Sequence, residues 1–280
     1  FSDCDRLSAF DASKAPLEEV CEGAFSGLDI RTLNLSASRF TTVPNRLCNG
    51  CDSLRTVVLP ATVTSIGERA FGNCRKLSSV NLPEETTTVE EGVFQNCDSL
   101  RWDGLPENLA SVGRYAFSGT TFADLTLPAS LASVTQSAFS HCVFNNLTIP
   151  STVTSIGQYA FDGAEVKGVL DITPAASLRM ETNTFQCSGG NYDEEGRYYY
   201  YHLQNVNWNS TTRFPKDQFC EIDNLYLPAG GSVSTEDGID YIFYDGVTDL
   251  VTVAPNTSDN RAYRITKAMT AREVTYTRYF

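Results

Sequence analysis

Hydrophobic residues recur along this chain in a unit of about 23 residues, and each unit carries a short run of alternating apolar positions. Val57-Val58-Leu59 and Leu147-Thr148-Ile149 are two such runs, and a proline follows each of them. The prolines that close these runs are Pro60, Pro83, Pro106, Pro128, Pro150, Pro174 and Pro228. Alternation places side chains on one face of a strand, and proline lacks the N–H that continued pairing needs. Each run therefore predicts one short strand.

A second apolar group follows the prolines and ends, in most units, at an aromatic residue. Residues 62–71 read TVTSIGERAF, and residues 152–161 read TVTSIGQYAF. We take the last residue of this group as the marker of its unit. The markers stand at positions 1, 25, 47, 71, 94, 117, 139, 161, 185 and 219, and position 47 is a leucine. A unit this short cannot bury its own apolar face, so the pattern predicts a repeat solenoid whose turns stack through a parallel sheet.

The expected fold is a mainly β solenoid with short helical turns, and it has two parts. Residues 1–228 hold about ten rungs of the repeat, with an insertion at 187–202 in the long unit between markers 185 and 219. Residues 229–280 are expected to form a small β cap or a divergent last rung. Asp245-Gly246 predicts a tight turn there, and residues 261–265 and 273–280 predict strands. Because Phe1 lies inside a repeat, we expect the native chain to extend upstream.

The repeat also resembles a known family. The pattern L-x-x-V-x-L-P, followed by x-x-V-x-x-I-G-x-x-A-F-x-x-C, is similar to the BspA-like, or Treponema-type, leucine-rich repeats, with clear copies at 54–74, 77–97 and 145–161. The resemblance implies a right-handed leucine-rich-repeat superhelix in a secreted or surface-attached bacterial protein, and several members are adhesins. The chain departs from the pattern in three places. Asp103-Gly104 replace apolar strand residues, Cys21 replaces a turn glycine, and the unit from 185 to 219 is longer.

Composition and charge argue against several functions. The 34 acidic and 21 basic residues give a net charge of -13, which repels the phosphates of nucleic acids and anionic lipid surfaces. No stretch approaches the ~18 consecutive apolar residues that a membrane helix needs. The two histidines, His141 and His202, offer little acid–base chemistry, and no hydrolase, zinc-protease or phosphate-loop motif is present. We therefore expect no enzyme activity, no cofactor or metal, no nucleic-acid partner and no membrane insertion.

Five of the nine cysteines fall at nearly one phase of the repeat. They are Cys4, Cys51, Cys74, Cys97 and Cys142, and other units place Thr120, Ala164 or Ser188 there. Four lie three residues after their marker, whereas Cys51 lies four residues after Leu47. A position that accepts Cys, Ala, Ser and Thr is small and buried, so we expect reduced, structural thiols. Disulfides between neighbouring rungs are the alternative. Cys48 and Cys51 lack the surroundings of a redox or zinc motif.

Two surfaces are candidates for binding a partner. The insertion and the strand after it contribute Tyr192, Tyr198, Tyr199, Tyr200, Tyr201 and Trp208. The strand residues expected to point outward include Asn81, Thr126, Thr148, Asp171, Asn207 and Tyr226. Tyrosine offers rigid, amphipathic contact area for proteins or sugars, and solenoids use broad faces for binding. The alternatives are a simple protruding hairpin whose tyrosines cover their neighbours, and a bare, solvated sheet.

The sequence therefore predicts a non-enzymatic binding protein, secreted or on a bacterial cell surface, that recognises a protein on a host or bacterial surface. One alternative is carbohydrate binding, in which Tyr198 to Tyr201 and Trp208 would stack on sugar rings. A second alternative is a structural spacer that holds another module away from the cell.

Overall fold

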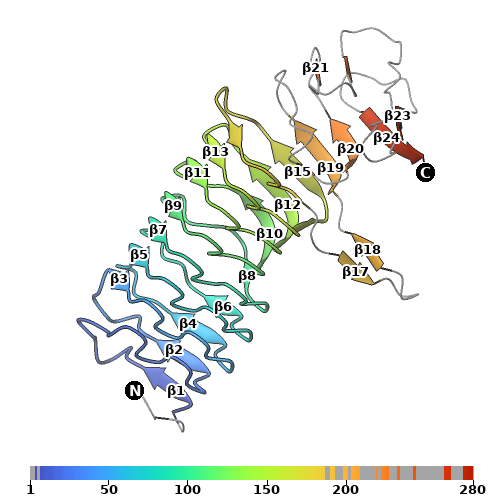
Figure 1. The fold of residues 1–280 in the computed structure, drawn as a ribbon. Helices are drawn as coiled ribbons and strands as arrows, with labels where there is room; N and C mark the ends of the chain where they lie inside the picture. The colour runs from blue at the N-terminus through green and yellow to red at the C-terminus, as the bar shows by residue number, and fades with distance from the viewer. Residues whose placement is uncertain are drawn as a thin grey trace.

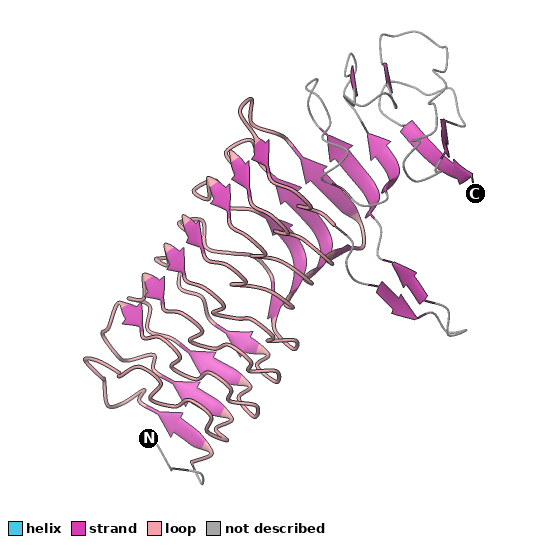
Figure 2. Ribbon diagram, in the orientation of Figure 1, coloured by secondary structure: helices cyan, strands magenta, loops and turns pink. Residues whose placement is uncertain are grey.

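The computed structural model describes residue 4, residues 7–186, residues 203–208 and residue 219 with their side chains. It describes seven further strands by their backbone alone, at 190–192, 198–200, 222–226, 232–233, 242–243, 262–265 and 274–279. Successive turns of the chain stack along one axis, and most turns contribute strands to two walls of parallel strands (Figure 1). The predicted solenoid is confirmed by this stacking. No described residue lies in a helix (Figure 2), so the predicted short helical turns are wrong.

The first wall contains the runs that precede the prolines. Its strands are β1 (Ala9–Asp11), β2 (Thr32–Asn34), β4 (Thr56–Val58), β6 (Ser79–Val80), β8 (Arg101–Trp102), β10 (Thr121–Thr126), β12 (Val143–Ile149), β15 (Val169–Ile172), β19 (Leu203–Trp208) and β20 (Ile222–Tyr226). They form two parallel sheets, β1-β2-β4-β6 and β8-β10-β12-β15-β19-β20, and β14 (Glu165–Val166) also pairs with β12. The break between the sheets falls beside Asp103 and Gly104, which are exposed after β8 ends at Trp102. The departure from the repeat pattern at 103–104 thus shortens the strand there.

The second wall contains shorter strands from the segment before each marker. They are β3 (Thr42–Val43), β5 (Ser65–Ile66), β7 (Thr88–Val89) and β9 (Ser111–Val112) in one parallel sheet, and β11 (Ser133–Val134), β13 (Ser155–Ile156) and β16 (Arg179–Met180) in another. The second residue of each strand packs inward, and Ile66 and Ile156 are 0% exposed. The first residue is a serine, threonine or arginine that faces outward.

The turn from the second wall to the first wall explains why no helix forms. Each of these turns contains two residues in the left-handed backbone region, four positions apart, with φ between 50° and 82°. The pairs are Gly23 and Gly27, Arg46 and Gly50, Arg69 and Asn73, Gly92 and Asn96, Tyr115 and Gly119, Ser137 and His141, and Tyr159 and Gly163. A right-handed helix needs negative φ throughout, so this repeated pair excludes even one continuous helical turn.

The space between the walls is filled by a file of stacked phenylalanine rings. Neighbouring centroids are 4.7 to 5.7 Å apart, and the ring planes lie within 25° of parallel. The file consists of Phe71, Phe94, Phe117, Phe139, Phe161, Phe185 and Phe219. A parallel bridge joins Phe185 to Phe219, so these two markers occupy neighbouring rungs despite the length of the unit between them. The predicted single file of aromatic markers is confirmed.

A second aromatic file, which the repeat pattern does not indicate, packs against the first. It consists of Trp102, Phe122 and Phe144, with centroids 6.4 and 5.3 Å apart. The Trp102 ring meets the Phe117 ring nearly edge-on, at 5.8 Å and 85°. Aromatic pairs favour both offset-stacked and edge-to-face arrangements, so the two files stabilise each other. This double file fills the core behind the longer strands β10 and β12.

The marker assigned to Leu47 is wrong, and its neighbour Cys48 holds that place. The backbone N–H of each marker donates to the carbonyl of the residue before the next marker, as the Phe71 N–H does to the Val93 carbonyl at 3.0 Å. Cys48 donates in this way to Ala70 at 2.7 Å. Cys48 therefore corresponds to Phe71, and Leu47 corresponds to Ala70. Both residues are 0% exposed. Leu47 is larger than the alanine it replaces, and Cys48 is smaller than the phenylalanine it replaces. The two exchanges compensate in volume and keep the core filled.

The carboxy-terminal strands fall where the sequence predicts them. β23 (Ala262–Ile265) and β24 (Val274–Tyr279) pair antiparallel, and β24 pairs antiparallel with β20 at the edge of the first wall. β21 (Ser232–Val233) and β22 (Ile242–Phe243) form a separate antiparallel pair. The turn expected at Asp245-Gly246 lies outside the described residues. The boundary between the repeats and a cap at 228 and 229 stays a prediction.

The exchange at positions 47 and 48 can be tested with a double-mutant cycle. Cys48→Phe alone should destabilise the protein by about 1 to 3 kcal/mol, because the ring has no space beside Leu47. Adding Leu47→Ala should recover most of this loss, since the pair then matches Ala70 and Phe71. Urea unfolding of the four proteins measures the coupling. Additive effects of the two changes would contradict the compensation.

Candidate binding surfaces

The outward residues predicted on the first wall form one continuous row. The parallel registers place Thr126 beside Thr148, Thr148 beside Asp171, Asp171 beside Asn207, and Asn207 beside Tyr226. This row, called the upper row below, crosses the five strands from β10 to β20. Thr126 is exposed, and Thr148, Asp171 and Asn207 are half-buried. The structure therefore brings Thr126, Thr148, Asp171 and Asn207 together on one surface, and the strand register places position 226 next in the row.

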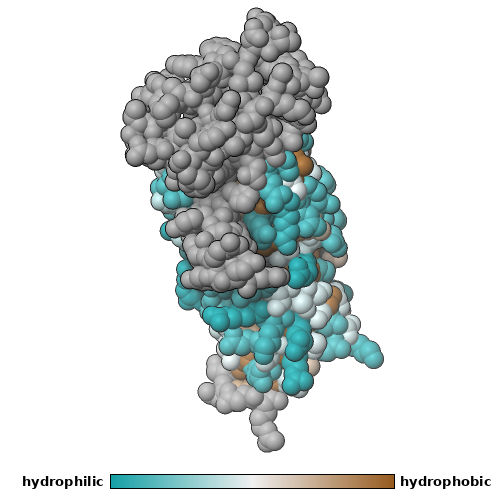
Figure 3. Space-filling model, turned by 90° about the vertical axis from the view of Figure 1, so that its right-hand side faces the viewer, coloured by the Kyte–Doolittle hydropathy of each residue, from teal (hydrophilic) through white to brown (hydrophobic). Residues whose placement is uncertain are grey.

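A second row, here called the lower row, runs beside the upper row on the same strands. Its members are Asp124, Asn146, Val169, Asn205 and Asn224. The Asn146 side chain donates to an Asp124 carboxylate oxygen at 2.7 Å and accepts from the Val169 N–H at 2.9 Å. The two rows contain two aspartates and no lysine or arginine. Seen from the right-hand side of Figure 1, the described surface is mostly hydrophilic (Figure 3).

Asn81 lies apart from the two rows and has a structural role. It follows β6, in the other sheet of the first wall. Its side-chain oxygen accepts from the Leu59 N–H at 2.6 Å, and its nitrogen donates to the Leu59 carbonyl at 3.0 Å. Asn81 thereby joins neighbouring rungs through its side chain at a place where other rungs pair through the backbone, as the Leu127 N–H does with the Thr148 carbonyl at 3.0 Å.

The tyrosine-rich insertion contains a two-stranded hairpin. β17 (Gly190–Tyr192) pairs antiparallel with β18 (Tyr198–Tyr200), so that Tyr192 lies opposite Tyr198. The hairpin lies to one side of the stacked strands (Figure 1). Tyr201 lies outside the described residues. Trp208, predicted as a sugar-stacking residue, is 2% exposed and belongs to the core. Its ring presents no face to a ligand, because position 208 alternates with the outward Asn207.

Four of the five cysteines predicted at this phase form a buried column, whereas the prediction is wrong for the fifth, Cys4, which is exposed. Cys51, Cys74, Cys97 and Cys142 are at most 1% exposed, and each thiol donates to a backbone carbonyl of the preceding rung at 2.9 to 3.1 Å. Cys51 lies three residues after Cys48, so the corrected marker removes its apparent irregularity. Thr120 occupies the same column, and its hydroxyl bonds the Phe117 carbonyl at 2.9 Å. The seven cysteines that the structure describes are free, and Cys4 and Cys21 are exposed.

Burial strongly affects the acidity of these thiols. It raises the pKa of Cys97 to about 12 and that of Cys142 to about 12. Burial also raises the pKa of Cys48. A thiol with a raised pKa is a poor nucleophile and a poor metal ligand at neutral pH. Among the residues described with side chains, no group of three His, Cys, Asp or Glu residues can hold a metal ion.

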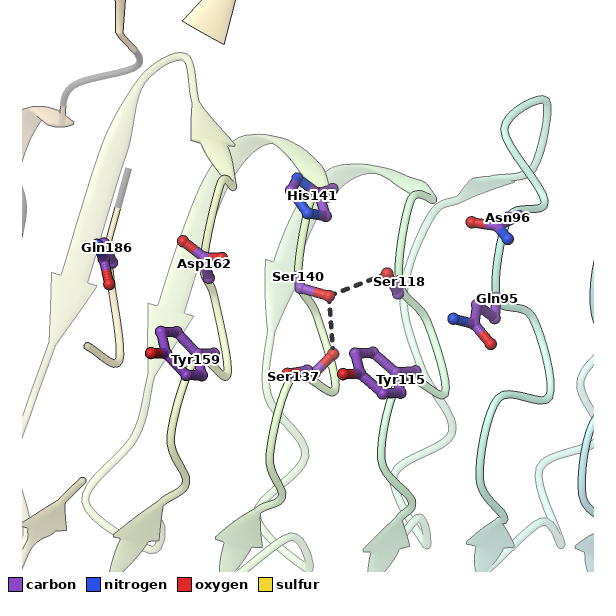
Figure 4. A pocket seen from close by; sticks show the side chains of 10 residues that line it. All are labelled: Gln95, Asn96, Tyr115, Ser118, Ser137, Ser140, His141, Tyr159, Asp162 and Gln186. Atoms are coloured by element: carbon purple, nitrogen blue, oxygen red, sulfur yellow. Dashed lines mark hydrogen bonds between the residues drawn. The ribbon is translucent and has the colours of Figure 1, made fainter. Parts of the chain in front are cut away.

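The repeated turns carry a polar groove that repeat analysis did not single out. It has a volume of about 550 Å³ and spans five successive turns (Figure 4). The lining residues are Gln95, Asn96, Tyr115, Ser118, Ser137, Ser140, His141, Tyr159, Asp162 and Gln186. Ser118, Ser137 and Ser140 form a buried floor, in which the Ser140 hydroxyl donates to the Ser118 hydroxyl at 2.9 Å or the Ser137 carbonyl at 3.0 Å.

Small neighbours leave room around the larger side chains of this groove. His141 stands between Gly119 and Gly163 in the column of second left-handed residues. A Cβ on Gly163 would lie 2.5 Å from Nδ1 of His141, so this glycine lets the imidazole lie against the next turn. Ser137 separates Tyr115 from Tyr159 in the column of first left-handed residues. When the turns are aligned, the two groove tyrosines share the first left-handed position with Gly23, Gly92, Arg46 and Arg69, and the residue type alone does not single them out.

Comparison with known proteins is consistent with this architecture. The family model of the BspA type leucine rich repeat region matches residues 1–101 and 99–190, in six copies. No curated protein matches the chain. No helix that could cross a membrane occurs in the described part of the chain.

Three solved bacterial proteins are similar to this chain. A leucine-rich repeat protein of T. pallidum is 23% identical over 55% of this chain and 75% of its own length, with a TM-score of 0.44. A leucine-rich cell surface protein of Faecalibacterium prausnitzii is 19% identical over 76% of this chain and 59% of its own, with a TM-score of 0.48. A leucine-rich repeat protein of Eubacterium ventriosum is 17% identical over 72% and 61%, with a TM-score of 0.37.

The raised thiol pKa values predict a loss of stability at alkaline pH. Between about pH 9 and pH 12 the thiols of the unfolded chain ionise while Cys97 and Cys142 stay neutral in the fold. The unfolded state then binds fewer protons, so each thiol lowers the free energy of unfolding by about 1.4 kcal/mol per pH unit. Urea unfolding in reductant across this range measures the slope. The variant Cys97→Ala/Cys142→Ala should show a shallower decline, and an unchanged slope would contradict the prediction.

Proposed function

The chain belongs to the BspA-type leucine-rich repeat family, and on this premise we propose that it is a non-enzymatic recognition scaffold on a bacterial surface. The proposed partner is a protein that docks on the outer face of the first wall, between β10 and β20. The observation that carries this proposal is the continuous upper row of Thr126, Thr148, Asp171, Asn207 and Tyr226. Its five strands at a separation of ~4.8 Å give a surface about 19 Å wide.

The two rows offer a rigid set of hydrogen-bonding groups. Asn146 is held by Asp124 and by the Val169 N–H, and the Asn205 side chain donates to the Gly168 carbonyl at 3.3 Å. Side chains already held in place lose less entropy when a partner binds. Solenoids create extended binding surfaces in this way, because each rung repeats the same outward positions.

Charge narrows the class of partner. The rows carry Asp124 and Asp171 without lysine or arginine, and the whole chain carries a net charge of -13. An acidic surface attracts basic partners and accelerates their association, most strongly at low ionic strength. We therefore propose a partner that presents arginine, lysine or backbone N–H groups to these rows.

A pair of matched variants tests the docking surface. Surface plasmon resonance measures binding of purified host-matrix and bacterial-surface proteins to the immobilised chain. Thr126→Lys, on β10, should weaken the interaction by at least about tenfold because it adds a charge to the contact. Ser133→Lys, on β11 of the second wall, is equally exposed and should leave affinity unchanged. Equal losses in both variants would contradict docking on the first wall.

Replacing residues 189–201 with a short Gly-Ser linker distinguishes binding by the insertion from binding by the two rows. Retained binding supports the rows alone, and lost binding transfers recognition to the tyrosine hairpin. A carbohydrate role for that hairpin now rests on its tyrosines, since Trp208 is buried. A glycan array that is silent where proteins bind would exclude it. If no protein binds with saturation, the remaining function is that of a spacer.

A further inference from the structure

Bulky residues occupy four of the first left-handed turn positions, namely Arg46, Arg69, Tyr115 and Tyr159, and the two tyrosines lie together in the groove. Glycine and asparagine adopt positive φ at little cost, whereas bulky residues do so with steric strain. The chain uses glycine at the first position of two turns and at the second position of four, namely Gly23 and Gly92, and Gly27, Gly50, Gly119 and Gly163. Tyr115 and Tyr159 nevertheless stand at first positions, each with φ of 56°.

Both tyrosines line the polar groove, and neighbouring side chains hold both rings. The Arg114 guanidinium lies 4.7 Å from the centre of the Tyr115 ring and donates to its hydroxyl at 3.1 Å. The Asn183 side chain donates to the Tyr159 hydroxyl at 3.2 Å. Strained residues that the surrounding structure holds in place occur preferentially at functional sites.

The spacing of the tyrosines leaves an open place between them. Ser137 occupies the turn between Tyr115 and Tyr159 and is buried in the floor of the groove. Two rungs at ~4.8 Å place the tyrosine backbones about 10 Å apart. The groove thus offers two aromatic rings with a hydroxyl-lined floor between them (Figure 4).

The lining of the groove indicates the chemistry of its ligand. It combines amide groups, as on Gln95 and Gln186, with hydroxyl groups and one carboxylate, Asp162, and none of its ten residues is lysine or arginine. Amides and carboxylates bond neighbouring hydroxyl groups, and aromatic rings pack against an apolar ring face. The neighbouring Arg114 already contacts the Tyr115 ring and hydroxyl, so the lining itself offers an acidic polymer no lysine or arginine. An extended peptide would need pockets for apolar side chains, which a floor of serines does not supply.

We propose that this groove binds a linear, neutral oligosaccharide, with Tyr115 and Tyr159 packing against sugar rings and Asp162 and the two glutamines bonding hydroxyl groups. The site lies on the turns and not on the first wall, so it is independent of the protein-docking surface. The regular spacing of the turns suits a ligand that itself repeats along a straight line.

The test uses variants that retain or improve folding. Tyr115→Asn and Tyr159→Asn place a residue tolerant of positive φ at each position, so thermal stability should stay unchanged or rise. Calorimetric titration with cellotetraose, maltotetraose and chitotetraose should show saturable binding of at least one of them to the native chain. Each variant should weaken that binding by roughly three- to tenfold, which corresponds to one lost aromatic contact.

Two controls make the outcome specific. Arg46→Asn changes a first-position residue with φ of 54° outside the groove and should leave sugar affinity unchanged. Thr126→Lys, on the first wall, should also leave it unchanged. The proposal is overturned if no neutral tetrasaccharide binds or if tetragalacturonate binds more tightly. It also fails if the double tyrosine variant binds as well as the native chain, or if an uncharged tetrapeptide binds where the sugars do not.

Discussion

Contact between successive turns is the interaction on which the rest of this structure depends. A unit of about 23 residues has no interior of its own, and its apolar side chains become buried only against the units before and after it. Phenylalanine supplies much of this contact, because flat rings stack at a separation close to the strand spacing. Their centroids lie 4.7 to 5.7 Å apart along the file. The step from one rung to the next therefore pairs the backbone strands and also stacks the rings of the core.

The second constraint is the pair of left-handed residues in each turn. It reverses the chain direction within a few residues and turns backbone N–H and carbonyl groups toward neighbouring turns, where they bond as Phe94 does to Ala116 at 2.8 Å. Buried backbone groups are thus satisfied between rungs and not within a helix. The cysteine column extends this pattern, since each buried thiol adds one more donor to a carbonyl of the preceding rung.

Because stacking and turn geometry fix the scaffold, outward side chains vary without loss of the fold. The first wall presents rows of amide, hydroxyl and carboxylate groups, and the turns present a groove with two tyrosines. The two surfaces lie on different parts of each rung and use different chemistry. A solenoid can therefore carry two independent binding surfaces, because the stacked rings and the backbone bonds between turns already hold the rungs together.

The repeat period, the parallel strands before the prolines, the aromatic file, the burial of four phased cysteines and the outward positions of the first wall could all be predicted from the residues alone. These features follow from periodicity, which sequence displays directly. The folded structure was needed to establish that Cys48 corresponds to Phe71, because Leu47 fills the missing volume and disguises the shift by one residue. It also removed Trp208 from the surface, replaced the expected helical turns with left-handed pairs, and joined Tyr115, His141 and Tyr159 in one groove. These outcomes depend on which atoms meet across neighbouring turns, and residue spacing along the chain does not contain that information.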